Sequence, residues 1–101
     1  MSPLARNYVD TIVAQLEPLL DDCDIDLLRL FALLVLVKDE DTTEEDVHDA
    51  WSVWRTASNP KHSCLVPFDD LTPDVQAVYT RYAEAVRAVA RAMAQPAVSR
   101  G

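Results

Sequence analysis

Glycine is almost absent from the sequence, since its one glycine is Gly101, the last residue. Tight turns with positive φ and two-residue β-hairpins normally use glycine or asparagine, so this scarcity argues against a β-rich fold. Apolar residues make up 50% of the 101 residues, which is enough for a core without metal or disulfide support. We predict a single all-α domain over residues 1–95, followed by a flexible tail over residues 96–101.

Cysteine is also scarce, with only Cys23 and Cys64. The N-terminal sequence MSPLARNYVD has no cationic region followed by an apolar run, so it does not resemble a signal peptide. We therefore expect a cytoplasmic protein in which both thiols stay reduced. The longest apolar run extends only from Leu30 to Val37, too short to span a bilayer, so we expect no membrane association.

Basic residues are rare in the first half of the chain. From Asp10 to Asp49 there are thirteen acidic residues and only two basic ones, Arg29 and Lys38, and the formal charge of the whole chain is −8. Binding to nucleic acid depends on cations that displace counterions from the phosphates, so we expect no direct nucleic-acid binding. An open alternative is that the acidic region imitates DNA and inhibits an enzyme that acts on nucleic acids.

The spacing of apolar residues predicts four main helices in a compact bundle. The first should run from about residue 3 to 17, because Ser2 and Pro3 form a helix-start signature and Pro18 ends or kinks the helix. The second, about residues 24–38, is apolar on nearly every side. Such a helix must be central to the fold or covered by a partner, which makes a homo-oligomer one expectation.

The third helix is predicted to follow Thr42 or Thr43, with Glu45 completing a capping box with Thr42. It should stop at residues 58–60, where Ser, Asn and Pro form a turn signal. The fourth helix should run from residue 73 to about residue 94, where apolar residues step by three and four throughout.

An irregular extended segment, about residues 58–68, is predicted between the third and fourth helices and should pack across the bundle. Residues 62–68 have no helical spacing and contain a proline. His62 begins this stretch, where an imidazole can bind carbonyls that no helix satisfies. In the preceding helix, Trp51 and Trp54 share one face, and we expect His48 to pack beside Trp51 or to bind a neighbouring backbone group.

The sequences VHDAWSVWR, KHSCLVPFDDL and YTR, in that order, resemble the repeat domain of ryanodine receptors, the RyR domain. The resemblance covers residues 46–90 and is shared with small actinobacterial and actinophage proteins of uncharacterised function. It implies a compact helical module used in interaction or assembly, and no enzymatic activity. The chain departs from the receptor repeats in a short six-residue gap between Arg55 and His62 and in Thr80, where the family has Asp, so a site built on those features would be altered.

One set of residues could form a binding groove. These are Trp54, Arg55, His62, Tyr79 and Arg81. Aromatic side chains beside arginine are typical of binding hot spots, and arginine supplies charge-assisted hydrogen bonds to anions. The set therefore predicts a groove for a partner, or for an anionic or aromatic ligand such as a nucleotide.

Catalytic and metal-binding patterns are not evident. Cys23, His48, His62 and Cys64 lack the close spacings of zinc ligands, and Cys64 has no glycine-rich oxyanion loop near it. We expect no metal, no cofactor and no enzymatic activity.

The sequence therefore favours a non-enzymatic protein-interaction module, a bacterial or phage accessory protein that binds a host protein or itself. The alternatives are the acidic DNA mimic and a protein that senses or sequesters a small anionic ligand.

Overall fold

The computed structural model describes residues 7–94. This part of the chain is all-α and has no strand, as the scarcity of glycine predicts. Its four helices and two short 3₁₀ helices follow one another in the order α1 (Tyr8–Leu16), α2 (Ile25–Val37), η2 (Asp39–Asp41), α3 (Glu44–Ser58), η3 (Phe68–Asp70) and α4 (Pro73–Ala94).

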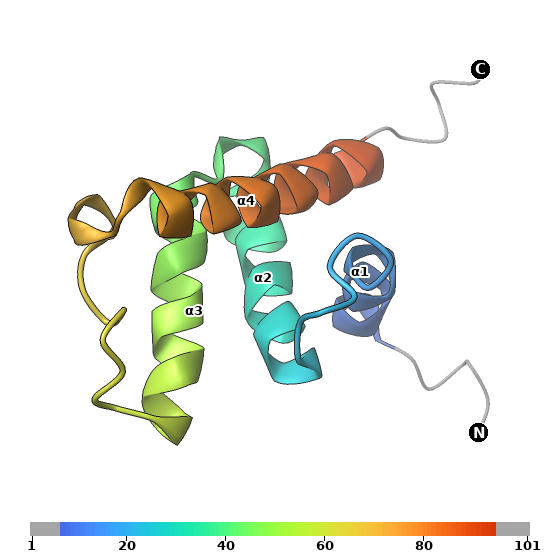
Figure 1. The fold of residues 1–101 in the computed structure, drawn as a ribbon. Coiled ribbons are helices and arrows are strands. Elements are labelled where there is room, and N and C mark those ends of the chain that lie inside the picture. The colour runs from blue at the N-terminus through green and yellow to red at the C-terminus, as the bar shows by residue number, and fades with distance from the viewer. Residues whose placement is uncertain (1–6, 95–101) are drawn as a thin grey trace, which may run out of the picture.

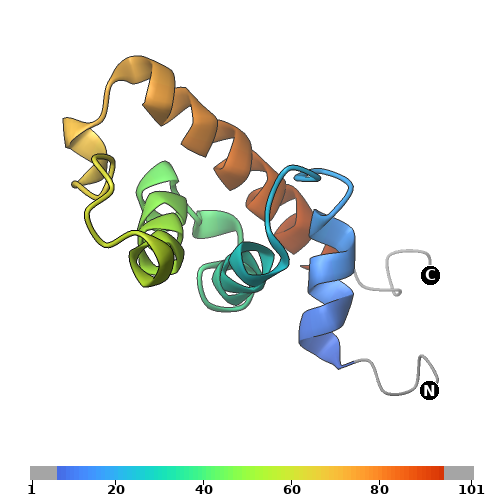
Figure 2. The same cartoon turned by 60° about the horizontal axis from the view of Figure 1, so that its bottom comes forward.

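The helix α2 is central to the arrangement. It lies between α1 and α3, and α4 crosses over all three (Figure 1). The view turned by 60° shows α4 running diagonally along one side of this layer, with the connection from α3 to α4 at its far end (Figure 2). The fold is therefore a layer of three helices that the fourth helix holds together.

One face of α2 supplies much of the core. Asp24 caps the helix by accepting a hydrogen bond from the backbone N–H of Asp26 at 2.8 Å. Phe31 is fully buried, and its ring centroid lies 5.4 Å from that of Tyr82 on α4. Burial of a side chain of this size contributes about 2–3 kcal/mol. The other residues on the buried face are Leu27, Leu28, Ala32 and Val35.

The first helix begins later than predicted. Asn7 has an extended backbone, with φ −93° and ψ 177°, and its side chain accepts a hydrogen bond from Asp10 N–H at 2.9 Å. The prediction of one continuous helix from residue 3 is therefore wrong at Asn7, because asparagine is a strong N-cap. The start signal at Ser2 and Pro3 and the predicted tail over residues 96–101 lie outside the described residues.

The capping box of α3 uses a different pair from the one predicted. Thr43 accepts from the Asp46 N–H, and the Asp46 carboxylate accepts from the Thr43 N–H at 2.9 Å. The hydroxyl of Thr42 instead donates to the Asp39 carbonyl at 2.9 Å, inside the protein. The predicted pairing of Thr42 with Glu45 is therefore wrong, while the predicted position of the helix start is confirmed.

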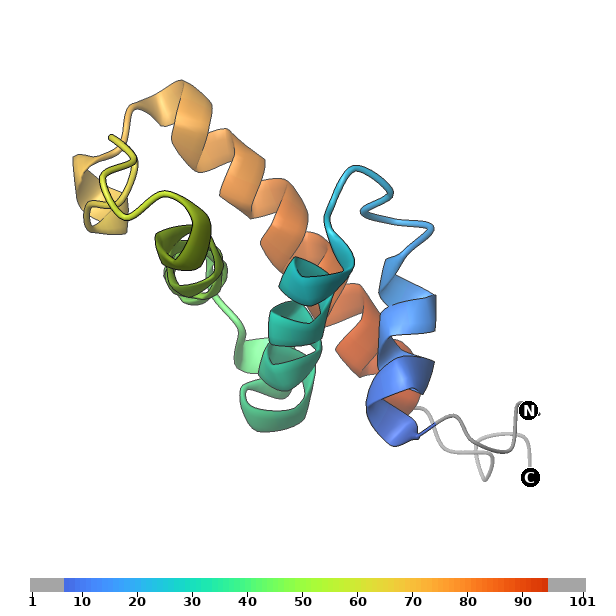
Figure 3. The same ribbon diagram turned by 90° about the horizontal axis from the view of Figure 1, so that it is seen from below.

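The segment between α3 and α4 is irregular, as predicted, and it consists of turns rather than of continuous extended backbone. His62 N–H donates to the Asn59 carbonyl and Leu65 N–H donates to the His62 carbonyl, both at 3.1 Å. Seen from below, the segment runs beside α3 before η3 turns it into α4 (Figure 3). Turns satisfy the backbone locally, which a lone extended segment beside a helix cannot do.

Candidate functional site

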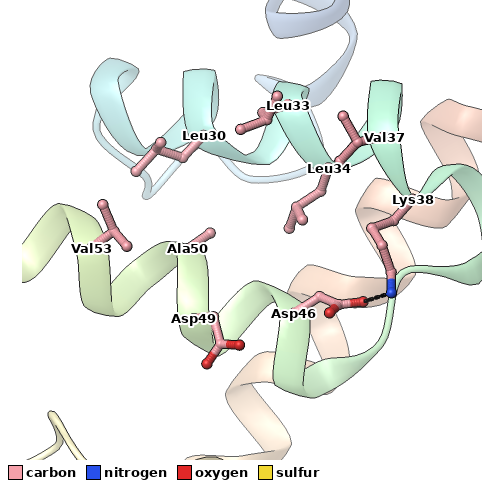
Figure 4. Close-up of a pocket in the computed structure, with 9 residues that line it drawn as sticks. All are labelled: Leu30, Leu33, Leu34, Val37, Lys38, Asp46, Asp49, Ala50 and Val53. Carbon is pink, nitrogen blue, oxygen red and sulfur yellow. Dashed lines mark ion pairs between the residues drawn. The ribbon is translucent and has the colours of Figure 1, made fainter.

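An open groove lies between α2 and α3, with a volume of about 400 Å³ (Figure 4). Residues from both helices line it, and the close-up shows the α2 side chains on one side and the α3 side chains on the other. The lining residues are Leu30, Leu33, Leu34, Val37 and Lys38 from α2 and its C-cap, and Asp46, Asp49, Ala50 and Val53 from α3.

The spacing of the lining residues explains the groove. Residues 30, 33, 34 and 37 on α2 and residues 46, 49, 50 and 53 on α3 each follow the i, i+3, i+4, i+7 pattern of one helix face. Ala50 is the small residue of the α3 wall, and a larger side chain there would occupy part of the groove. The α2 wall is entirely apolar, whereas the α3 wall changes along its length from acidic to apolar.

The apolar walls of the groove are exposed. The exposed fractions of Leu33, Val37 and Val53 are 51%, 63% and 65%. Single exposed apolar residues are ordinary, but several on one concave surface are typical of an interaction site. One face of α2 is therefore buried in the core, as the prediction of a central helix requires. On the side of the groove, Leu30 and Leu34 are half-buried, and Leu33 and Val37 stay exposed in the described part of the chain.

A charged end closes the groove. Lys38 Nζ lies 3.5 Å from Asp46 Oδ2, and both belong to the lining (Figure 4). Asp49 lies next to this pair and is exposed. The opposite end, formed by Leu30 and Val53, carries no charge. The groove is therefore polarised along its length.

A second feature is the cluster of aromatic and basic residues around Trp51. The Arg55 guanidinium carbon lies 4.5 Å from the Trp54 ring centroid and 5.7 Å from that of Trp51. His62 meets Trp51 edge to face, with centroids 5.2 Å apart. Three of the five predicted groove residues, Trp54, Arg55 and His62, therefore surround Trp51.

The other two predicted residues take different roles. Tyr79 is only 3% exposed and lies beneath the cluster, where its ring meets those of Trp51 and His48. Burial raises the pKa of Tyr79, and raises that of Tyr82 to about 12, so both phenols stay neutral. Tyr79 is therefore a core residue.

Arg81 is occupied elsewhere. Its guanidinium donates two hydrogen bonds to the Asp22 carboxylate, at 2.8 and 3.3 Å. These bonds hold the pKa of Asp22 below its ordinary value and raise that of Arg81. The pair joins α4 to the turn before α2, so the structure gives Arg81 a structural partner.

Both histidines form hydrogen bonds with the backbone of the segment between α3 and α4. His48 stacks on Trp51 with centroids 5.7 Å apart, and its Nε2–H donates to the Val66 carbonyl at 2.6 Å, so both predicted roles are confirmed. His62 was predicted to bind carbonyls, but its Nδ1 accepts a hydrogen bond from Cys64 N–H at 3.0 Å. The proton of neutral His62 therefore resides on Nε2.

Cys23 and Cys64 are free thiols. Burial raises the pKa of Cys23. In the described part of the chain, no three His, Cys, Asp or Glu side chains gather as metal ligands do. None of the described helices is long and apolar enough to cross a membrane.

The sequence pattern indicated a site on the aromatic face of α3 and did not indicate the groove beside it. The sequence did contain one indication of the groove. The second helix has more apolar residues than a single buried face can hold. The i, i+3, i+4, i+7 pattern of Leu30, Leu33, Leu34 and Val37 could have identified the exposed wall. The facing wall could not be found in this way, because Asp46 and Asp49 look like an ordinary solvated helix start.

The fold and the groove define a small all-α domain with an open apolar surface. The chain belongs to the family described as Domain of unknown function (DUF7701), which matches residues 6–91. This match includes α1 and α2, which lie outside the region that resembles the RyR domain. That resemblance stays a prediction. No curated protein and no solved structure matches the chain.

Proposed function

We propose that the protein is a cytoplasmic, non-enzymatic interaction module, a bacterial or phage accessory protein that binds another protein through the groove between α2 and α3. The observation that carries this proposal is the apolar wall of Leu33, Val37 and Val53, whose exposed fractions are 51%, 63% and 65%. A helix laid into an apolar groove buries such residues and removes them from water.

The geometry of the groove suits a helical segment. On α2, the apolar wall extends over seven residue steps, from Leu30 to Val37. At a rise of about 1.5 Å per residue this is about 10 Å, or two helical turns. An amphipathic helix presents apolar residues at that same spacing, so its side chains can enter between the walls.

Selection from a displayed library of helical peptides, about three or four turns long, tests the proposal. The paired substitution Leu33→Gln and Val53→Gln makes both walls polar without adding charge. We expect wild-type protein to enrich amphipathic peptides, and we expect this variant to lose at least about tenfold in affinity for them, equivalent to about 1.4 kcal/mol.

The matched control is Val78→Gln on α4, because Val78 is 43% exposed and does not line the groove. This variant should bind the selected peptides as the wild type does. Equal binding by wild type and the Leu33/Val53 variant would contradict the proposal, provided that circular dichroism shows both to be folded.

A second candidate function is the binding of a small anion at the cluster around Trp51. Arg55 belongs to none of the ion pairs among residues 7–94, and its buried Nε has no hydrogen-bond partner there. A guanidinium over an indole, in a cluster that also contains an imidazole, can donate to phosphate or carboxylate oxygens.

Thermal unfolding with inorganic phosphate and with nucleoside phosphates tests this second candidate. A bound anion would raise the melting temperature of the wild type, and Arg55→Gln would remove the rise. Arg29→Gln is the matched control, because Arg29 is exposed and pairs with Asp26 away from the cluster. An equal rise in both variants would show that the anion acts nonspecifically.

A further inference from the structure

We infer that the occupant of the groove is an amphipathic helix of a partner protein with basic residues at one end. This inference rests on the proposed function and adds the chemistry of the partner. The structure assigns the apolar part of that helix to the end of the groove formed by Leu30 and Val53. Its basic end lies at Asp46 and Asp49.

The charge around the polar end carries the inference. Every Asp or Glu in residues 39–49 lies at this end of α2 and α3, and the same stretch contains no Lys or Arg. The cation of the groove itself, Lys38, is already paired with Asp46 at 3.5 Å. Arg91 of α4 pairs with Glu40 at 3.3 Å.

Several acids remain without a cation. Among residues 7–94, no ion pair includes Asp39, Asp41, Glu44, Glu45 or Asp49. Asp49 lines the groove at its rim, and its exposed carboxylate points away from α2, so a cation held beside the groove can reach it (Figure 4). Complementary charge of this kind raises the association rate and selects against acidic partners.

A second copy of the chain fits the groove less well. Its formal charge is also −8, so two copies repel each other as they approach. The exposed apolar faces of two copies could pack, but the acidic end of each would gain no cation from the groove of the other. Charge complementarity therefore favours a basic partner over self-association.

Two synthetic peptides test the inference. Both are amphipathic helices of about four turns with leucines spaced by three and four residues. One has Lys and Arg in its terminal turn, and the other has Gln at those positions. We expect the basic peptide to bind the wild-type protein at least about tenfold more tightly at low salt, and the difference to shrink in 0.5 M salt, where the Debye length is only about 4 Å.

Variants of the protein separate charge from apolar contact. Asp49→Asn should lower the affinity for the basic peptide by about threefold and leave the affinity for the neutral peptide unchanged. Glu84→Gln on α4 is the matched control, since Glu84 is exposed and outside the groove, and it should change neither affinity. The paired Leu33→Gln and Val53→Gln variant should have a lower affinity for both peptides.

Each contrary result has a distinct meaning. Equal affinity for the two peptides, lost in the Leu33/Val53 variant, would overturn the basic partner and leave the proposed function standing. Failure of both peptides to bind would also overturn this inference, while the library selection tests the groove separately. A light-scattering mass of twice 11.3 kDa that returns to 11.3 kDa in that variant would assign the groove to a second copy.

Discussion

His48 is the residue whose replacement should most affect the segment between α3 and α4. It is 1% exposed, it stacks on Trp51, and its Nε2–H donates to the Val66 carbonyl at 2.6 Å. Its ring also meets the edge of Tyr79, with centroids 4.7 Å apart. We predict that His48→Ala destabilises the protein strongly and that His48→Phe does so only slightly.

The magnitude follows from three contributions. Loss of the buried ring and the cavity it leaves should cost about 2–3 kcal/mol, somewhat less than for a phenylalanine. Loss of the hydrogen bond to Val66 costs about 1 kcal/mol. His48 Nδ1 is buried without a hydrogen-bond partner, so its removal recovers about 1 kcal/mol.

The sum for His48→Ala is a loss of about 2–3 kcal/mol in the free energy of unfolding. Phenylalanine keeps most of the ring packing. The lost hydrogen bond to Val66 and the removal of the unpaired Nδ1 nearly cancel, so His48→Phe should lower the free energy of unfolding by less than about 1 kcal/mol. In a domain of this size, the alanine variant should melt about 10–20 °C lower than the wild type.

Urea unfolding followed by tryptophan fluorescence measures both changes, because Trp51 lies against His48. Amide exchange at Cys64 and Leu65 reports the turns of the segment, which should open in the alanine variant. Equal destabilisation by alanine and phenylalanine would refute the reasoning, since the hydrogen bond would then outweigh ring packing. A loss below about 0.5 kcal/mol in both variants would show that His48 does not anchor the segment.

Three further predictions concern stability. Phe31→Ala should cost about 3–5 kcal/mol in urea unfolding, whereas Leu33→Ala on the exposed face of the same helix should cost less than about 1 kcal/mol, and similar costs would contradict the assignment of the two faces. Asp39 has a φ of 56°, so Asp39→Gly should raise the free energy of unfolding by up to about 1 kcal/mol, and a loss of stability would argue against that backbone. Asp22→Asn should cost less than about 1 kcal/mol at pH 7, because its ion pair with Arg81 is exposed. The lowered pKa of Asp22 means that this difference is complete above pH 3.8 and disappears as the pH falls through the folded-state value, whereas a difference that persisted at lower pH would have another cause.

Local sequence chemistry determined the helices. The near absence of glycine, the spacing of apolar residues and the Thr-Pro start of α4 predicted all four, and α2 and α4 have almost the bounds expected. Errors occurred where two local signals competed. Asn7 caps α1 although Ser2 and Pro3 formed the more familiar signature, and Thr43 caps α3 although Thr42 had a glutamate at the right spacing.

The predicted binding residues were separated by tertiary contacts. Tyr79 and Arg81 are only two residues apart, yet one is buried beneath Trp51 and the other pairs with Asp22. A helix turns about 100° per residue, so residues two apart point in very different directions. Only the packing of α4 against the other helices determines which side of α4 faces the core.

The sequence by itself determined an all-α domain with an acidic first half and one helix that is too apolar to be exposed to solvent on all its faces. These properties depend on composition and on short-range spacing, which a sequence displays directly. The tertiary structure alone decided that α2 leaves Leu33 and Val37 exposed, and that Val53 lies across a groove from them with Asp49 at the rim. That groove depends on how two helices lie side by side, and no spacing within either helix specifies it.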